Sequence, residues 1–214
     1  MTIDLNKTRY RVLLVFLWSS VLYIGYILTN QFHLFTLHTL PLTRLDQLIP
    51  FLPWTIAPYL ILVLGMYLFA FIDDENDFIS ALIALTIAVC INYMIYILYP
   101  TTYPRPPLPA DTELGSGLYH WLTSIDTPAN CFPSGHITTP AVGCWYLGRH
   151  HKTLRPYLFI TFAILSLTTL TTKQHYIVDI PAGLVTASLG ILIANALIKS
   201  DKYNFNCLRR YWKK

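Results

Sequence analysis

Long stretches without a charged residue dominate this chain. Six of them contain no Asp, Glu, Lys or Arg: 12–43, 47–72, 78–104, 127–148, 156–172 and 180–198. They show no polar helix face, whereas a surface helix of a soluble protein has one. A membrane-spanning helix needs roughly 17–25 mostly apolar residues. The pattern therefore predicts six spans, trimmed to 12–30, 54–72, 79–99, 135–149, 156–172 and 176–198.

Composition supports this interpretation. The 214 residues are 54% hydrophobic and 12% charged, whereas a soluble domain carries about 25% charged residues. So few charges exclude a disordered chain and a nucleic-acid-binding protein, and they make a large soluble bundle of buried helices the weaker alternative. The first span is too long for a signal peptide, and residues 29–32 do not form a cleavage site. We predict an all-α polytopic membrane protein with one domain over residues 1–214.

The distribution of cations predicts the orientation in the membrane. Six spans place both termini on one side, and three of the 15 Lys and Arg residues lie on the other side, namely Arg44, Arg105 and Lys173. Cytoplasmic loops are rich in Lys and Arg, so both termini are expected in the cytoplasm. The net charge of +4 is then a signal of topology. The small size and short loops favour a bacterial inner membrane, with a Golgi or endoplasmic reticulum membrane as the alternative.

The cations on the cytoplasmic side belong to the N-terminus, to one loop and to the C-terminal tail. They are Lys7, Arg9, Arg11, Arg149, Lys152, Arg155, Lys199, Lys202, Arg209, Arg210, Lys213 and Lys214.

The longest outer segment, 100–134, contains two features. Its proline-rich start cannot be helical, so Arg105 is expected on an extended segment just beyond the third span, as a phosphate ligand or as an interfacial anchor. Residues 117–125 predict a short amphipathic helix lying on the membrane interface.

A Pro-Ser-Gly-His run at 133–136 immediately precedes the fourth span. Ser134 is a preferred helix N-cap, and a helix N-terminus attracts anions through its free N–H groups and partial positive charge. Gly135 permits close approach of an anion, and His136 in the first turn can donate a proton to it. The alternative is a capped helix start with a polar histidine.

His175 and Asp179 begin the last predicted span. The spacing i, i+4 places them on one helix face, where the carboxylate is expected to accept the Nδ1 proton and leave Nε2 as a nucleophile. An ionisable pair at the membrane end of a span is functional by default, although it can also serve only to anchor the helix.

The number of spans brings Arg105, His136 and His175 to the same outer face. A cation, a helix N-terminus, an acid histidine and an oriented nucleophilic histidine predict phosphoryl transfer. These segments carry no Asp or Glu cluster for metal ions, so we expect chemistry without metal or cofactor.

These motifs, Arg105-Pro106, the 133–136 run and His175 with Asp179, resemble the three signatures of the type 2 phosphatidic acid phosphatase superfamily over residues 44–195. The resemblance implies a six-span enzyme that dephosphorylates or transfers lipid phosphates without metal. It implies that His175 is the nucleophile, Asp179 its orienting carboxylate and His136 the acid. Arg105, Ser134 and Gly135 match phosphate-binding positions.

Two cations of that pattern are missing, because Leu98 stands in the place of a Lys and Thr169 in the place of an Arg that follows a Ser, here Thr168. Lys173 is a tentative replacement as a phosphate ligand, and Arg44 is a weaker one. The reduced pattern resembles the branch containing the inositol phosphorylceramide and sphingomyelin synthases. Three functions therefore stay open: a lipid-phosphate phosphatase, a lipid phosphotransferase and a non-catalytic lipid-binding or transport protein.

Overall fold

The computed structural model describes residues 5–107, 109–111 and 113–199. Helices account for 72% of the residues, which confirms the all-α class. The elements, in chain order, are α1 (Leu5–Gln31), β1 (His38–Thr39), α2 (Arg44–Leu48), η1 (Pro53–Thr55), α3 (Ile56–Leu64), η2 (Gly65–Phe71), α4 (Glu75–Leu98), β2 (Thr101–Thr102), α5 (Ser116–Ile125), α6 (Gly135–His150), α7 (Arg155–Thr171) and α8 (Asp179–Lys199). Five cations used for the orientation lie outside the described residues, namely Lys202, Arg209, Arg210, Lys213 and Lys214.

Every predicted span corresponds to a helical segment. The second is composite, because η1, α3 and η2 follow one another without a break from Pro53 to Phe71. The last predicted span starts too early, since α8 begins at Asp179 and not at residue 176. The cause is a turn after α7, in which the N–H groups of Gln174 and His175 both donate to the carbonyl of Thr169.

Four helical segments of the described chain are long and apolar enough to cross a membrane. They are Lys7–Gln31, Pro53–Phe71, Glu75–Leu98 and Asp179–Ile198. The α7 helix is apolar but has 17 residues, and α6 has 16 residues, including several polar ones. The structure therefore supports a membrane protein, and the six-span topology goes beyond what helix length and composition show.

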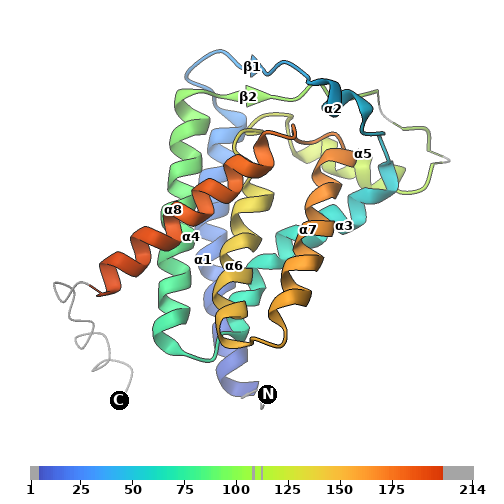
Figure 1. The fold of residues 1–214 in the computed structure, drawn as a ribbon. Helices are drawn as coiled ribbons and strands as arrows, with labels where there is room; N and C mark the ends of the chain where they lie inside the picture. The colour runs from blue at the N-terminus through green and yellow to red at the C-terminus, as the bar shows by residue number, and fades with distance from the viewer. Residues whose placement is uncertain (1–4, 108, 112, 200–214) are drawn as a thin grey trace.

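The two ends of the helix bundle differ in character. One end carries the parallel pair β1 and β2, together with α2 and α5, and the N-terminus lies at the other end (Figure 1). At that other end, Lys7 and Arg11 donate to the carbonyl of Asp73, and His151 lies 3.6 Å from its carboxylate. Asp77 is bound there by Arg149 and His150. The start of α1, the start of α4 and the turn between α6 and α7 are thus joined.

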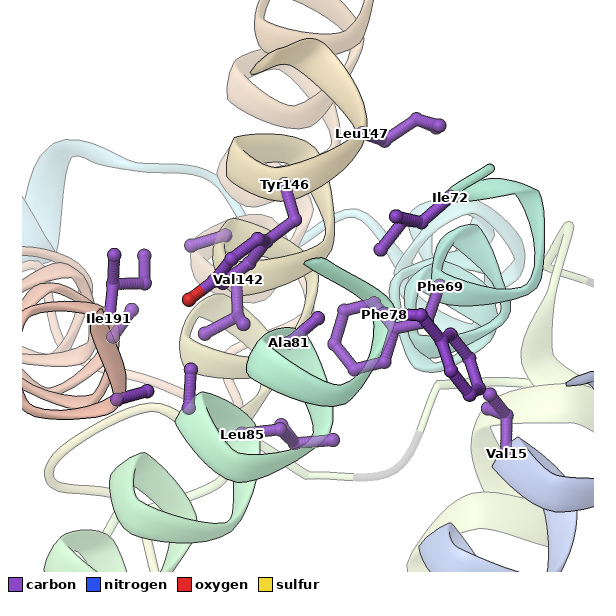
Figure 2. Packing of buried hydrophobic residues seen from close by; sticks show 14 of the residues in the cluster. Val15, Phe69, Ile72, Phe78, Ala81, Leu85, Val142, Tyr146, Leu147 and Ile191 are labelled. Atoms are coloured by element: carbon purple, nitrogen blue, oxygen red, sulfur yellow. The ribbon is translucent and has the colours of Figure 1, made fainter. Parts of the chain in front are cut away.

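The hydrophobic core lies between α4, α6, α8 and η2. Val142 and Tyr146 of α6 face Ala81 and Leu85 of α4 in this core (Figure 2). The closest packing is between α4 and α8, where a Cβ atom on Gly190 would lie 2.4 Å from the carbonyl oxygen of Ala84. This core packs α4, α6 and α8 against one another.

The short helix predicted at 117–125 is present as α5. Its buried residues Tyr119 and Leu122 pack against Ile56 and Tyr59, while Trp121 on the other side is exposed. The helix α5 therefore covers the outer end of α3, close to the candidate site.

Candidate active site

Three segments distant in sequence meet at the end of the bundle that carries β1 and β2. Arg105 follows β2, His136 is the second residue of α6, and His175 lies in the turn before α8. All three line one pocket of about 350 Å³. The His136 and His175 rings have centroids 5.6 Å apart and meet edge to face. The structure thus brings together the three residues that the sequence placed on one face.

The His175–Asp179 pair forms, but not on one helix face as the spacing suggested. His175 precedes α8, and Asp179 is its first residue. Asp179 Oδ2 accepts the N–H of Tyr176 at 2.8 Å and lies 3.1 Å from His175 Nδ1. A carboxylate at a helix N-terminus therefore holds both the turn and the imidazole.

The tautomer of His175 follows from its neighbours. Besides Asp179, the carbonyl oxygen of Cys131 lies 2.9 Å from Nδ1. Both neighbours are acceptors, so Nδ1 carries the proton and donates, and Nε2 keeps its lone pair. Since the side chain is 5% exposed, its orientation is fixed before any substrate binds.

His136 is held by an aromatic neighbour. Its ring stacks on Tyr59 with a centroid distance of 4.4 Å, and its Nδ1 lies 3.3 Å from the Tyr59 hydroxyl. Tyr59 belongs to α3 and is itself buried. Tyr59 thereby keeps His136 at the N-terminus of α6, where its ring faces His175.

Ser134 occupies the N-cap position of α6, as predicted, but its side chain does not cap the helix. Its hydroxyl is buried and has no hydrogen-bond partner among the described residues. The backbone around it is tightly fixed, because Ser134 N–H donates to the carbonyl of Asp179 and a Cβ on Gly183 would lie 2.7 Å from the Ser134 carbonyl oxygen. An uncommitted hydroxyl beside a helix N-terminus suits an anionic ligand.

Arg105 makes the densest polar contacts of the pocket. Its Nη1 donates to the carbonyl of Asp126 at 2.7 Å, and its Nη2 donates to the Asp126 carboxylate at 3.0 Å and to the Gln174 side-chain oxygen at 2.5 Å. Tyr26 of α1 donates to the other Asp126 oxygen at 2.6 Å. Burial raises the pKa of Asp126, against the opposing effects of the Tyr26 hydrogen bond and the Arg105 charge.

Lys173 does not line this pocket. Its Nζ donates to the carbonyl oxygens of Asp46 and Ile49, at 2.9 and 2.6 Å, and burial lowers the pKa of this amine, although the nearby Asp46 charge raises it. The Asp46 carboxylate also accepts the N–H of Ile177 at 2.8 Å. These bonds hold the turn that carries His175 against α2, and the Lys173 amine lies on these carbonyls and not in the pocket that Arg105, His136 and His175 line.

The residues at the positions of the two missing cations, Leu98 and Thr169, supply no positive charge. Leu98 is 64% exposed at the end of α4. Thr168 and Thr169 donate their hydroxyl protons to carbonyls of their own helix, α7. Arg44, the other outer cation, is exposed at the start of α2.

Four residues near the site were missed by the sequence reasoning: Tyr26, Tyr59, Asp126 and Gln174. Gln174 had a local signal, since it is adjacent to His175. Asp126 had a weaker one, because it is the only acidic residue between 114 and 134. The two tyrosines lie within apolar spans and have no signal, since only packing brings them to the histidines.

The part of the pocket that extends from the histidines along α1, α3 and η2 is lined mainly by apolar residues. Along α1 its lining runs from Tyr26 to Ser19, and along α3 and η2 from Tyr59 to Met66. Seven residues of helix correspond to a depth of roughly 10 Å. The lining of this part of the pocket is therefore suited to an apolar group and not to a charged one.

The donor set of the site consists of imidazole, guanidinium, hydroxyl and amide groups. Among the described residues no group of three His, Cys, Asp or Glu is placed to hold a metal ion. Two facing histidines, one oriented through Nδ1, can perform nucleophilic and acid–base chemistry, and Arg105 lines the same pocket.

Comparison with known proteins gives one finding. A family model described as the PAP2 superfamily matches residues 51–193, a range that contains every site residue predicted from the sequence. No curated protein and no solved structure matches the chain.

Proposed function

The chain belongs to the PAP2 superfamily, and from this membership we propose that it is a membrane phosphatase. It removes phosphate from a lipid phosphate or pyrophosphate, without a metal, through a phosphohistidine intermediate. Members of the superfamily act on lipid phosphates as phosphatases or phosphotransferases. The observation that carries the proposal is the pair of facing histidines, because the Nδ1 contacts of His175 leave its Nε2 lone pair available.

In the first step His175 Nε2 attacks phosphorus. The N–P bond forms, the bond between phosphorus and the leaving oxygen breaks, and His136 protonates that oxygen. Asp179 stabilises the charge that develops on the His175 ring. Arg105, the Ser134 hydroxyl and the N–H of Gly135 stabilise the equatorial oxygens of phosphorus.

In the second step His136, now without its proton, takes a proton from water. The water oxygen attacks phosphorus, the N–P bond breaks, and its electron pair returns to Nε2. Phosphate leaves and His136 is again protonated, so both histidines regain their starting states.

The proposed topology has six spans with both termini in the cytoplasm and the site at the outer face. The α6 helix of 16 residues is about 24 Å long, shorter than the hydrocarbon core of about 30 Å. His136 at its outer end therefore lies near the headgroup level, where a lipid phosphate sits. The short loops favour a bacterial inner membrane.

The second candidate function is a phosphotransferase, in which a lipid hydroxyl replaces water in the second step. The absence of cations at Leu98 and Thr169 favours the phosphotransferase, since this reduced pattern resembles the branch that contains the inositol phosphorylceramide and sphingomyelin synthases. A non-catalytic lipid-binding protein is the third candidate, and the intact pair of His175 and Asp179 speaks against it.

One experiment separates the three. Purified protein in detergent is incubated with EDTA and phosphatidate, phosphatidylglycerophosphate, a prenyl pyrophosphate or a lipid A phosphate, with and without diacylglycerol or ceramide. Release of phosphate supports the phosphatase, a new phospholipid supports the phosphotransferase, and no turnover supports the binding protein.

The matched variants are His175→Ala and His120→Ala. His120 also lies on the outer segment, where its Nε2 contacts the carbonyl of Pro109, but it does not line the pocket. We expect the first to abolish turnover in a folded protein and the second to retain it. Near-normal activity of His175→Ala contradicts the mechanism.

A further inference from the structure

The two facing histidines have hydrogen-bond partners of different charge. The Nδ1 atom of His175 lies 3.1 Å from the Asp179 carboxylate and 2.9 Å from the carbonyl oxygen of Cys131. The Nδ1 atom of His136 lies 3.3 Å from the hydroxyl of Tyr59, and no other described residue forms a hydrogen bond or an ion pair with this side chain. One imidazole is therefore paired with a carboxylate and the other with an uncharged hydroxyl.

Packing on two sides fixes the position of Tyr59. The side chain is 2% exposed, and it belongs to a buried cluster with Ile56 of its own helix and with Tyr119 and Leu122 of α5. The face of its ring stacks on His136 with a centroid distance of 4.4 Å. The hydroxyl is thus held beside Nδ1 before any ligand binds.

The stacked ring and the hydroxyl of Tyr59 constrain His136 in different ways. Stacking fixes the plane of the imidazole, whereas the hydroxyl distinguishes its two nitrogen atoms by binding one of them. Within the part of the chain that the structure describes, Nε2 has no hydrogen-bond partner, and His136 lines the same pocket as His175. The nitrogen that remains available to a ligand in this pocket is therefore Nε2.

The roles proposed for the two histidines require opposite changes of charge. The His175 ring gains positive charge when Nε2 attacks phosphorus, and the His136 ring loses its positive charge when it protonates the leaving oxygen. A neighbouring carboxylate favours the charged form of an imidazole, which suits the nucleophile and would oppose the acid. A hydroxyl adds no charge and can accept a hydrogen bond from Nδ1 in both states of the ring.

We propose that Tyr59 is the positioning residue of the acid histidine. Its oxygen accepts a hydrogen bond from the Nδ1–H of His136 throughout the reaction, so the proton that moves is the one on Nε2. In the first step Nε2 gives this proton to the leaving oxygen, and in the second step Nε2 takes a proton from water. Tyr59 exchanges no proton itself. The inference rests on the proposed function and deepens it, because it assigns the geometry of the acid to a residue outside the three motifs.

The test removes the hydroxyl and keeps the ring. Tyr59→Phe retains the stacking surface for His136 and loses the partner of Nδ1. The matched control is Tyr146→Phe. Tyr146 is buried on the same helix as His136, its hydroxyl donates to Asn195 at 3.3 Å, and it does not line the pocket.

Two water-soluble probes separate acid catalysis from general damage to the site. Octyl phosphate releases an alkoxide, which must be protonated as it leaves, whereas 4-nitrophenyl phosphate releases a phenolate that is stable without a proton. The readout is kcat/KM of the full-length protein in detergent for each probe. This constant covers the steps up to the phosphohistidine, because the alcohol or phenol leaves when that intermediate forms.

We expect Tyr59→Phe to lower kcat/KM about 10–100-fold for octyl phosphate and less than about threefold for 4-nitrophenyl phosphate, since only the first needs the proton. Tyr146→Phe should leave both constants within about threefold of the wild-type values. A merely structural role of Tyr59 lowers both constants equally. Equal losses for the two probes, a larger loss for 4-nitrophenyl phosphate or an unchanged constant for octyl phosphate overturns the proposal.

A second measurement needs neither turnover nor the Tyr59→Phe variant. NMR of the histidine nitrogens in wild-type protein, with His136→Ala to assign the signal, should show the uncharged His136 ring protonated on Nδ1 and not on Nε2. The opposite tautomer overturns the proposal even if Tyr59→Phe fails to fold. If the wild-type protein turns over neither probe, the proposed function fails and the tautomer still decides the contact. Turnover of both probes with equal losses in Tyr59→Phe refutes only the role of Tyr59.

Discussion

Replacing Lys173 by Met distinguishes a residue that supports the nucleophile from one that binds phosphate. Met retains the volume of the side chain and removes its ammonium group. In the structure this group donates at 2.9 and 2.6 Å to the carbonyls of Asp46 and Ile49. The turn that these bonds hold carries His175 two residues further on.

The magnitude follows from those two bonds. A hydrogen bond to a charged group contributes about 1.5–3 kcal/mol, and partial exposure of Lys173 and its lost side-chain entropy reduce the sum to about 1–3 kcal/mol. In a chain of this length each kcal/mol corresponds to a shift of about 2–4 °C in Tm. A displaced turn moves His175 away from phosphorus, and a shift of about 1 Å costs up to about 100-fold in rate.

The assay combines thermal unfolding in detergent, steady-state kinetics and competitive inhibition by inorganic phosphate. We expect Lys173→Met to lower Tm by about 2–10 °C and kcat by about 10–100-fold, with the inhibition constant of phosphate unchanged within about threefold. Lys152→Met is the control, since Lys152 is exposed in the turn at the opposite end of the bundle. An unchanged Tm together with weaker inhibition by phosphate refutes the supporting role and restores Lys173 as a phosphate ligand.

Two further predictions use matched pairs of variants. Ser19→Phe fills the deep end of the pocket and should lower kcat/KM for long-chain substrates about tenfold more than for water-soluble short-chain ones. Ser20→Phe loses a hydrogen bond to the same Phe16 carbonyl but does not line the pocket, so it should show no such dependence on chain length. Equal effects of the two variants contradict a chain-binding role of the pocket. Gly183→Ala places a methyl group 2.7 Å from the Ser134 carbonyl oxygen and should lower the free energy of unfolding by about 1–3 kcal/mol and the activity with it. Gly117→Ala, with no atom within 4 Å of the new methyl group, should leave both unchanged in denaturant titrations and phosphate-release assays, and similar losses in the two variants count against tight packing at Ser134.

Much of the helical architecture was predictable from sequence because lipid as a solvent leaves a simple signature. A helix that meets hydrocarbon on its outside is apolar all round, so the helical segments appear as charge-free stretches. The last segment shows the limit of that signal. Residues 176–178 are apolar or aromatic and extend the pattern, yet the turn bonded to Thr169 ends only at Asp179, since hydrogen bonding and not hydropathy determines where a helix begins.

The candidate site divides in the same way. His136, His175 and Arg105 were recognisable because each stands at the end of an apolar stretch. An ionisable residue at such a position is energetically costly and therefore indicates a function. Lys173 satisfied the same criterion, but its amine donates to two carbonyls of α2 and its C-terminal end, those of Asp46 and Ile49. The position of a residue at the end of a helix restricts the end of the bundle at which it lies. It does not determine the direction in which a long, flexible side chain points.

The sequence alone therefore determined the helical class, the helical segments and the two histidines to which we assign the chemistry, since these depend on local apolar runs and on motifs of a few residues. Only the tertiary structure decided what surrounds them: that Asp126 neutralises Arg105, that Tyr59 holds His136 and that Lys173 supports the turn of His175. These contacts join residues 21 to 127 positions apart. The packing of helices brings such residues together, and no local pattern along the chain records it.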